Sequence, residues 1–258
     1  MSMQVTVLGS GSSGNAAFVK TAGARILVDA GFSYRQLSKR LREIGEDPTK
    51  LDAILVSHEH SDHVIGLPQT IKKTGAPVYL TELTSDSLDW GDKKPVLKTF
   101  QAGSRLKIGD VEVDTFTIPH DAVDPVGFCV RHGNAKVGLV TDLGYMTESI
   151  KHRLKGCNML LLESNHDVEM LKVGPYPWFV KQRVMSRVGH LSNQAVCDYL
   201  ASDFDVSTRV LVLGHLSDHN NHPEIARMFA DQALKQAGAV DTRLLVAQQG
   251  APSEVFEF

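Results

Sequence analysis

The chain has 258 residues, 42% of them hydrophobic, which is enough to bury a sizeable core in one large domain or two small ones. Its formal net charge is -3, from 27 basic and 30 acidic residues. This balance excludes an overall basic surface for nucleic acid or membrane, so a polyanionic partner would have to be held locally.

The N-terminal sequence and the cysteines both bear on where in the cell the protein is found. The first residues lack the basic start, apolar stretch and cleavage site of a signal peptide, and no apolar run approaches about 18 residues. The three cysteines, Cys129, Cys157 and Cys197, are far apart and form no CxxC pattern. We therefore expect a cytoplasmic protein with no membrane association, whose cysteines serve packing.

Short apolar runs rich in β-branched residues recur along the chain with turn residues between them, as is typical of strands. The expected strands, in chain order, are MQVTVLG (3–9), ARILVDAG (24–31), LDAILVS (51–57), APVYL (76–80), VEVDTFTIP (111–119), VGFCV (126–130), AKVGLVTD (135–142), CNMLLLES (157–164), TRVLVLG (208–214) and RLLVAQQ (243–249).

Helical spacing separates many of these strands. In the segment 33–47, Leu37, Leu41 and Ile44 repeat with helical period, Ser33 is a plausible N-cap and Gly45 a stop. The other expected helices are 64–73, 81–90, 146–154, 175–188, 192–203 and 221–236. Strands and helices in this order predict a mixed α/β fold.

No low-complexity tract or linker divides the chain, so we expect one domain over residues 1–258. The polar motifs DAG, SHEHSDH, IPHD, TDLG, ESNHD and GHLSDH each follow an apolar strand directly. Polar groups at the ends of rigid strands are a common way to build a site in a layered fold.

The strongest local signal is ILVSHEHSDHV, read as a strand that ends at Ser57, a polar turn, and a helix that begins near His63 or Val64. In an extended segment, residues two apart project to one face, so His58 and His60 can chelate one ion. Asp62 and His63 can then address a second ion nearby. Imidazole and carboxylate ligands suit zinc, manganese or iron.

Two ions need more ligands than one turn supplies. His120, Asp142 and His215 each follow an apolar run, and an aspartate can bridge two cations. We assign the first ion to His58, His60 and His120, the second to Asp62, His63 and His215, and Asp142 to both.

This pattern resembles the metallo-β-lactamase superfamily of four-layer αββα hydrolases, in which two central mixed β-sheets are flanked by helices. The motifs GSGSSGN (9–15), DAGFS (29–33), ESNHD (163–167), 174–193 and 214–223 resemble its WalJ/YycJ-like bacterial group, regarded as 5′-to-3′ DNA exonucleases. Too few residues separate Asp142 from His215 for the second domain that ribonuclease J-like relatives insert there. Small-molecule lactamases often carry Cys where this chain has Asp142.

The letters GHLS occur twice, and the two histidines have different settings. His215 follows a strand and fits the last metal ligand, whereas His190 follows an expected helix that Gly189 can terminate, before a helix capped by Ser192. By resemblance to ribonuclease Z-like relatives, His190 is expected to face the phosphate; the alternative is a solvated histidine in a turn that joins two helices. There it could stabilise or protonate oxygens that gain charge.

Further residues are candidates for substrate binding, each against a purely structural alternative. The glycine-rich segment 9–15 can cradle phosphate or be a plain β-turn, and the backbone at Ser192 can receive phosphate. The expected substrate-binding residues are Ser10, Ser12, Ser13, Asn15, Asn165, His166, Ser192 and Asn193.

Two further groups concern nucleic acid and ligand orientation. Lys181, Arg183 and Arg187 could line a phosphate track or be merely solvated, and Trp178 is expected in a core or an interface rather than stacked on bases. Asp29 is expected to orient a ligand histidine without binding metal.

The expected function is a dinuclear metal-dependent phosphodiesterase, a 5′-to-3′ DNA exonuclease acting through a metal-bridging hydroxide that Asp62 orients. The cofactors would be two Zn²⁺ or Mn²⁺ ions, and the partner the 5′ end of DNA, preferentially single-stranded, with no required protein partner. The alternatives are a hydrolase of a small phosphodiester, (thio)ester or lactam, and a metal-containing binding protein without turnover.

Overall fold

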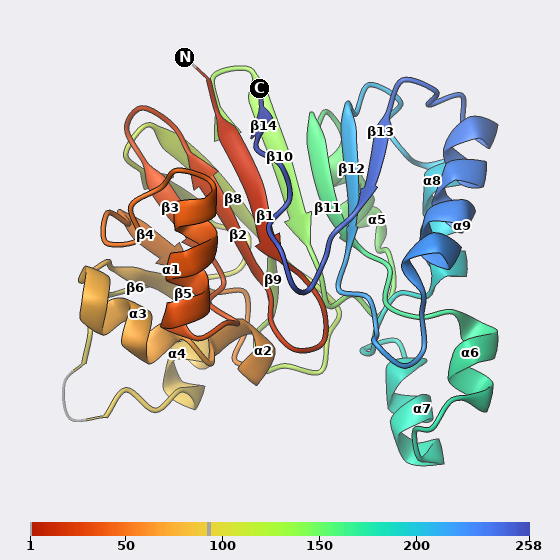
Figure 1. Ribbon diagram of the computed structural model, residues 1–258, viewed down its shortest axis with the longest axis horizontal. Helices are drawn as coiled ribbons and strands as arrows, with labels where there is room; N and C mark the ends of the chain where they lie inside the picture. Colours follow the sequence, from red (N-terminus) through yellow and green to blue (C-terminus); the bar gives the residue numbers. More distant parts are fainter. Residues whose placement is uncertain (1, 92–93) are drawn as a thin grey trace. The chain divides into compact units, whose positions relative to one another are not determined.

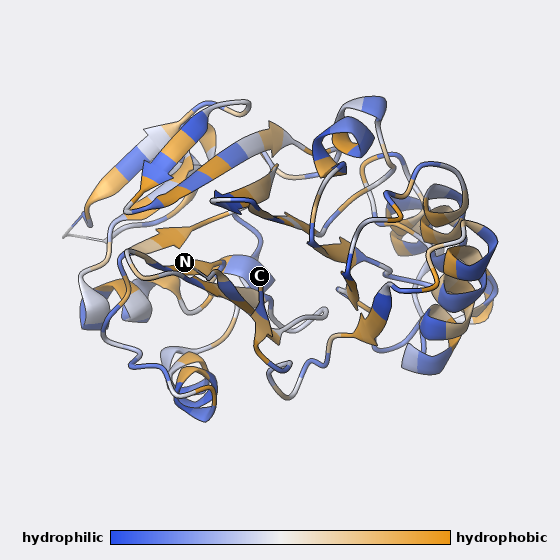
Figure 2. Cartoon of the chain, turned by 90° about the horizontal axis from the view of Figure 1, so that it is seen from above, coloured by the Kyte–Doolittle hydropathy of each residue, from blue (hydrophilic) through white to orange (hydrophobic). Residues whose placement is uncertain are grey.

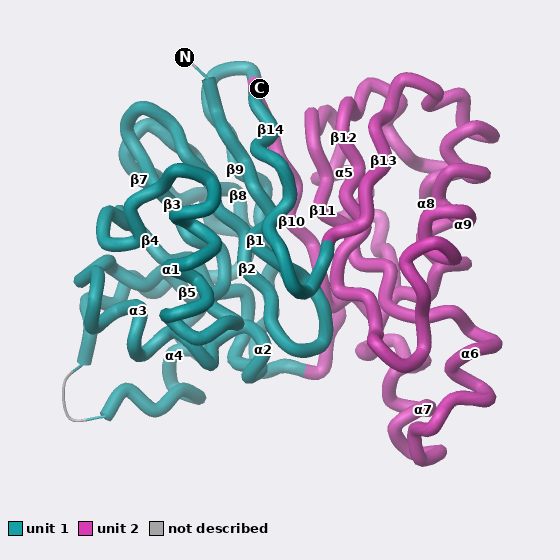
Figure 3. Tube along the Cα trace, in the orientation of Figure 1, with its two compact units in different colours: residues 1–117, 122–134, 248–258 teal, residues 118–121, 135–247 magenta. Residues whose placement is uncertain are grey.

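The computed structural model describes residues 2–91 and 94–258, which divide into two compact units (Figure 3). Unit 1 comprises residues 1–117, 122–134 and 248–258, and unit 2 comprises residues 118–121 and 135–247. The chain therefore passes from one unit to the other four times.

Unit 1 contains a seven-stranded mixed sheet of order β14-β1-β2-β3-β4-β5-β6. The pairs from β14 to β3 are antiparallel and those from β3 to β6 are parallel. The strands are β1 Gln4–Gly9, β2 Ala16–Lys20, β3 Arg25–Val28, β4 Ala53–Leu55, β5 Val78–Thr81, β6 Leu97–Phe100 and β14 Phe256–Glu257.

Three more strands of unit 1 pair in the antiparallel order β7-β8-β9. Their bounds are β7 Arg105–Ile108, β8 Val111–Thr117 and β9 Val126–His132. The Asp114 carboxylate of β8 accepts from Arg105 Nε at 2.6 Å and from Arg131 Nε at 2.7 Å. One acid thus ties all three strands together.

The helices of unit 1 are α1 Tyr34–Glu43, α2 Ser61–Val64, α3 Leu67–Thr74 and α4 Glu82–Ser87 (Figure 1). α1 begins at the capping box formed by Ser33 and Gln36, which satisfies backbone N–H groups of its first turn. It buries Leu37 and Leu41 in the same hydrophobic cluster as Leu27 and Ile54 of the sheet.

Unit 2 contains four parallel strands in the order β10-β11-β12-β13. They are β10 Ala135–Val140, β11 Met159–Glu163, β12 Val210–Gly214 and β13 Arg243–Val246. Every residue of the first three is buried, which explains their continuous apolar sequences. Because parallel strands end at one edge, the residues that follow them lie close together.

The helices of unit 2 are α5 Glu148–Leu154, α6 Val168–Val173, α7 Trp178–Val184, α8 Asn193–Ser202 and α9 Pro223–Gln236. α8 and α9 lie side by side (Figure 1). Figure 2 shows that the strands are mostly hydrophobic, whereas the helices carry both hydrophobic and hydrophilic residues. The helices thus present mixed faces. β10, β11 and β12 lie in the core, whereas β6, β7 and β13 are partly exposed.

All ten expected strands are present, and Ser33 and Ser192 are N-caps as predicted. The sequence analysis did not predict β2, β6, β7, β14 or α6. Two expected boundaries were wrong. α2 begins at Ser61 rather than near His63, and α7 ends at Val184, so Gly189 does not terminate it.

Among the described residues, no helix is long and apolar enough to cross a membrane. Cys129, Cys157 and Cys197 form no disulfide, and the first two are buried. Burial of these two thiols agrees with the packing role expected for them.

Candidate metal centre

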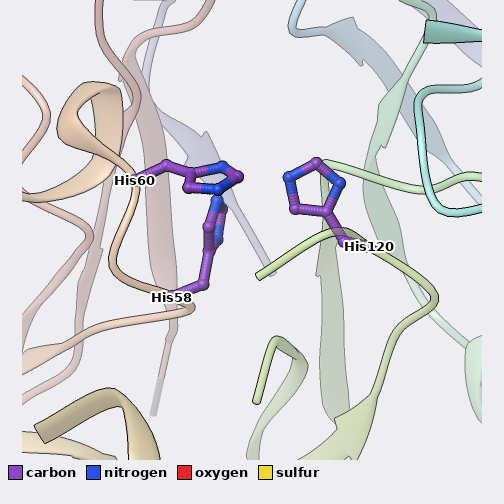
Figure 4. A group of neighbouring side chains, drawn as sticks. All are labelled: His58, His60 and His120. Atoms are coloured by element: carbon purple, nitrogen blue, oxygen red, sulfur yellow. The ribbon is translucent and has the colours of Figure 1, made fainter. Parts of the chain in front are cut away.

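Unit 1 presents three histidines and an aspartate directly after β4. The His58 and His63 side chains are completely buried, with ring centroids 4.2 Å apart, and the His58 and His60 centroids are 4.7 Å apart. Figure 4 shows the His58 and His60 rings edge to face. His60 is the N-cap of α2, so Asp62 and His63 stand in the first helical turn.

Asp29 and Ser57 contact the Nδ1 atoms of the His63 and His58 rings. The Asp29 carboxylate lies 2.8 Å from His63 Nδ1 and accepts hydrogen bonds from the Ser57 backbone N–H and hydroxyl at 2.8 and 2.9 Å. Ser57 Oγ lies 2.9 Å from His58 Nδ1. Both rings are thus oriented through Nδ1, and Asp29 has the orienting position predicted for it.

The backbone around this motif is joined to two earlier loops. Asn15 N–H donates to the Asp62 carbonyl at 2.8 Å, Ala30 N–H to His63 at 2.7 Å and Gly31 N–H to Asn15 at 2.9 Å. A Cβ on Gly31 would lie 1.7 Å from the Asp62 carbonyl oxygen, a distance that no other residue type tolerates. The DAGFS glycine is therefore needed for close backbone approach.

In unit 2, Asp142 follows β10, His120 lies in the short segment 118–121, and His215 follows β12. Asp142 Oδ1 is 3.7 Å from His120 Nε2 and 3.4 Å from His215 Nδ1. Asp142 and His215 have φ of 62° and 55°, as Asp29 has 59° in unit 1. Left-handed backbone is costly for residues other than glycine and is found preferentially at functional sites.

Glu163, the last residue of β11, is completely buried and was not predicted as a site residue. Its carboxylate lies 2.7 Å from His190 Nδ1 and 2.8 Å from His215 Nδ1, and it accepts from Leu143 N–H at 2.6 Å. Burial alone would raise the pKa of Glu163, but the charges of these two histidines and hydrogen bonds from them lower it to about 2. Glu163 is therefore an anion that orients both rings.

His190 and His215 thus share one carboxylate although their backbones differ. His215 is nearly buried, whereas 21% of the His190 side chain is exposed. Burial opposes the charged form of His190, yet the neighbouring Glu163 raises the pKa of His190 overall. His120 is held in a similar way, with its Nδ1 3.2 Å from the Gly189 carbonyl oxygen.

The donors fit divalent cations. Within unit 2, ligand atoms of Asp142, Glu163, His190 and His215 all lie within 4.8 Å of one another. Five imidazoles, those of His58, His63, His120, His190 and His215, have Nδ1 within 3.3 Å of a hydroxyl, carbonyl or carboxylate oxygen. Histidine ligands of metals characteristically engage their second ring nitrogen in this way.

The four substrate-binding candidates of the glycine-rich segment 9–15 differ in their exposure to solvent. Ser12 and Ser13 are exposed, whereas Ser10 and Asn15 are buried. The Asn15 amide nitrogen lies 3.1 Å from Asp62 Oδ2 and 3.2 Å from His63 Nε2, and Asn15 Oδ1 accepts from the Ser10 hydroxyl at 2.8 Å. Asn15 is therefore placed to orient Asp62. Contact of these four residues with substrate stays a prediction.

The other four substrate candidates lie in a buried polar network of unit 2. The Asn165 side-chain amide donates to the His215 backbone carbonyl at 2.9 Å, and Asn193 Oδ1 accepts from Ser164 Oγ at 2.7 Å. Ser192 caps α8. Burial is the main reason that the pKa of His166 is lowered to about 4, so this ring is neutral at pH 7. Their contact with substrate also stays a prediction.

The basic and aromatic residues of α7 differ from expectation. Lys181 is buried, and its ammonium group donates to the Lys172 carbonyl at 2.8 Å, so it cannot line an exposed phosphate track. Trp178 is 64% exposed, so it does not lie in the core, and the expected interface role stays a prediction. Its indole ring lies on the surface because α7 presents its first turn to solvent.

Residues 24–216 match the family model of the β-lactamase superfamily domain. The chain is 38% identical over 244 residues to the exodeoxyribonuclease YycJ of Bacillus anthracis, covering 92% of this chain and 91% of that protein. It is 36% identical over 239 residues to the exodeoxyribonuclease WalJ of Streptococcus pneumoniae, covering 90% and 88%.

Among solved structures, the metallo-β-lactamase fold protein YhfI from Bacillus subtilis aligns with a TM-score of 0.72 at 20% identity. The alignment covers 98% of this chain and 99% of that one. At this identity the likeness concerns the fold alone, and it confirms the expected αββα class of two mixed sheets flanked by helices. The sequence comparisons, the fold and the His/Asp motifs all agree. The chain belongs to the metallo-β-lactamase superfamily, and the YycJ and WalJ exodeoxyribonucleases are among its relatives.

Proposed function

We propose that this chain is a dinuclear metal-dependent phosphodiesterase that removes nucleotides from the 5′ end of DNA. The carrying observation is that five site imidazoles are each oriented by an oxygen within 3.3 Å of Nδ1, as is characteristic of histidines that bind metal. The proposed ligands are the seven residues assigned from the sequence: His58, His60, Asp62, His63, His120, Asp142 and His215.

Bound divalent ions such as Zn²⁺ or Mn²⁺ supply an acidified water and offset the negative charge of the phosphate. Asp62 is held by the Asn15 amide and can orient the attacking water. His190 is oriented by Glu163 and can donate a proton to the leaving oxygen or stabilise its charge. Each step therefore has a side chain whose orientation is fixed by a second residue.

The DNA substrate is proposed from the named activity of the YycJ and WalJ relatives. We propose that the exposed Ser12 and Ser13 hydroxyls, with the helix start at Ser192, receive the 5′-terminal phosphate of a single strand. No protein partner is needed for this chemistry. Cysteines that form no disulfide suit the cytoplasmic location that we propose with it.

Hydrolysis of a small phosphodiester, (thio)ester or lactam is the second candidate, favoured by the net charge of -3. The two candidates differ in their response to salt. A polyanion that contacts several cationic groups loses affinity steeply as salt rises, whereas a small ligand does not.

The proposal is tested by a gel time course on 3′-labelled, 5′-phosphorylated single-stranded DNA, with metal-stripped protein resupplied with Mn²⁺ or Zn²⁺. We expect a ladder that shortens from the 5′ end. Asp142→Ala should lower the rate by about a hundredfold or more, because a group that stabilises the transition state through the metals is lost.

Asp198→Ala removes an exposed acid of α8 and serves as the matched control, with an unchanged rate expected. If wild-type protein shown to bind two metals per chain cleaves no DNA with either ion, the exonuclease proposal fails. Turnover of small phosphodiesters by the same sample would then support the second candidate.

A further inference from the structure

The segment 168–188, which contains α6 and α7 and is called the α6–α7 arm below, exposes large apolar side chains. Trp178 is 64% exposed, Phe179 71% and Val173 86%. Figure 1 shows α6 and α7 together, away from the parallel strands of unit 2. Two neighbouring aromatic rings so exposed to water indicate a binding surface.

The arm is firmly attached to the residues of the candidate metal centre in unit 2. Buried Lys181 ties α7 to the end of α6 through the Lys172 carbonyl. Arg183 of α7 pairs with Asp121, the neighbour of His120. His190 N–H donates to the Val184 carbonyl at 3.0 Å, so the rings of α7 have a fixed place relative to His190.

The charge of the arm has the opposite sign to that of the whole chain. Its residues include four basic ones, Lys172, Lys181, Arg183 and Arg187, and one acid, Glu169, while the full sequence carries a net charge of -3. Arg183 and Arg187 are exposed, and the Arg187 guanidinium lies 4.4 Å from the centre of the Tyr145 ring. A surface of aromatic rings beside arginines is complementary to single-stranded nucleic acid.

We propose that Trp178 and Phe179 form a stacking surface for bases of the single-stranded DNA substrate, with Arg183 and Arg187 beside its phosphates. This inference rests on the proposed function and adds to it a site for nucleotides that are not being cleaved. Stacking tolerates any base, so the surface would hold the strand without selecting its sequence.

Trp178 itself can report the contact, because the chain has only one other tryptophan, Trp90. Trp90→Phe therefore leaves Trp178 as the sole indole fluorophore. We would titrate this metal-loaded protein with a short phosphorothioate single strand, which resists cleavage, and with an abasic strand of the same length. Stacked bases should quench Trp178 fluorescence to saturation, whereas the abasic strand should leave it nearly unchanged.

In parallel, fluorescence anisotropy of labelled single strands would compare Trp178→Ala/Phe179→Ala with wild type. We expect the affinity to fall about tenfold or more, because two stacking contacts are lost. Met228→Ala is the matched control, since it removes an exposed apolar side chain of α9. Circular dichroism would verify that all variants are folded.

The outcomes separate this inference from the proposed function. If wild-type protein neither binds nor cleaves DNA, the proposed function fails and the stacking surface with it. If wild-type protein cleaves DNA but the double variant binds it equally well, or the abasic strand quenches Trp178 equally, only the stacking surface is overturned. Fluorescence that changes with protein concentration in the absence of DNA would instead assign the surface to a second copy of the chain.

Discussion

Glu163 holds His190 and His215 through one carboxylate oxygen, Oε1, while its other oxygen, Oε2, accepts from the Leu191 backbone N–H. It is not expected to touch substrate. Glu163→Gln would keep the size of the side chain but remove its charge. Metal affinity should fall about 10- to 100-fold, the usual effect of losing a residue that orients ligands. Competition with a chromophoric chelator would measure it.

Glu169→Gln, an exposed acid of α6, is the matched control and should bind metal like wild type. Equal affinities for Glu163→Gln and wild type would show that Glu163 serves stability and not the metal centre.

Asp142 occupies a left-handed backbone conformation with φ of 62°. Replacing it with Gly or Ala removes the same carboxylate, but only Gly adopts this φ freely, and the difference is about 1 kcal/mol. In metal-free protein, Asp142→Gly should therefore unfold at a higher temperature than Asp142→Ala in scanning calorimetry. At Asp86, inside α4, the order of the two variants should be reversed, because Gly weakens a helix.

The position of the HxHxDH motif after a strand could be predicted because its spacing is local, and the same holds for Asp142 and His215 at strand ends, whereas their binding of metal stays a prediction. Glu163 ends a strand in the same way, but nothing in its local sequence distinguishes a buried acid bound to two histidines from an ordinary one. That distinction depends on His190 and His215, which are distant in sequence and close only in the fold.

At the scale of elements, Asp114 joins β7, β8 and β9, and its pKa sets a pH dependence. Burial opposes the charge of Asp114, but hydrogen bonds from Arg105 and Arg131 and the charges of these arginines lower its pKa overall. A lowered pKa stabilises the fold above the unfolded pKa of about 4, and this contribution is lost as pH falls through the folded pKa.

Asp114→Asn should therefore lower the free energy of unfolding at pH 7 by about 1 kcal/mol, the scale of two partly exposed ion pairs. The difference from wild type should vanish near pH 2 in urea unfolding curves. Asp231→Asn, which removes an exposed pair with Lys235 on α9, should change stability by less than about 0.5 kcal/mol. A constant difference across pH would contradict the assignment to the Asp114 charge.

The elements that were not predicted are short and weakly patterned. β7 reads RLKI, a run of only four residues in which basic and apolar side chains alternate, and β14 has only two residues. α6 has six residues and depends on the Asp167 side chain, which accepts from Glu169 and Met170 N–H groups. Such elements form because neighbouring strands pair with them or side chains cap them. The apolar runs of β10 to β12, by contrast, can be recognised from the sequence alone.

At the scale of the whole molecule, we predict that the chain unfolds as one domain. Neither unit is a continuous segment, since the chain passes between them four times, so neither can form from one stretch of sequence. Calorimetry of metal-free protein should show a single transition, with equal calorimetric and van't Hoff enthalpies. Metal should raise its midpoint as a ligand of the native state does. Two resolved transitions would show that the units unfold separately.

The backbone bonds that join Asn15, Ala30 and Gly31 to the metal motif also have a consequence for hydrogen exchange. Their amide groups donate to the carbonyl oxygens of Asp62, His63 and Asn15, so we expect the three hydrogen bonds to open together. They should exchange with deuterium at one common rate, and metal should slow all three together. The exchange rates of these three amides would then report whether Asp62 and His63 are correctly positioned.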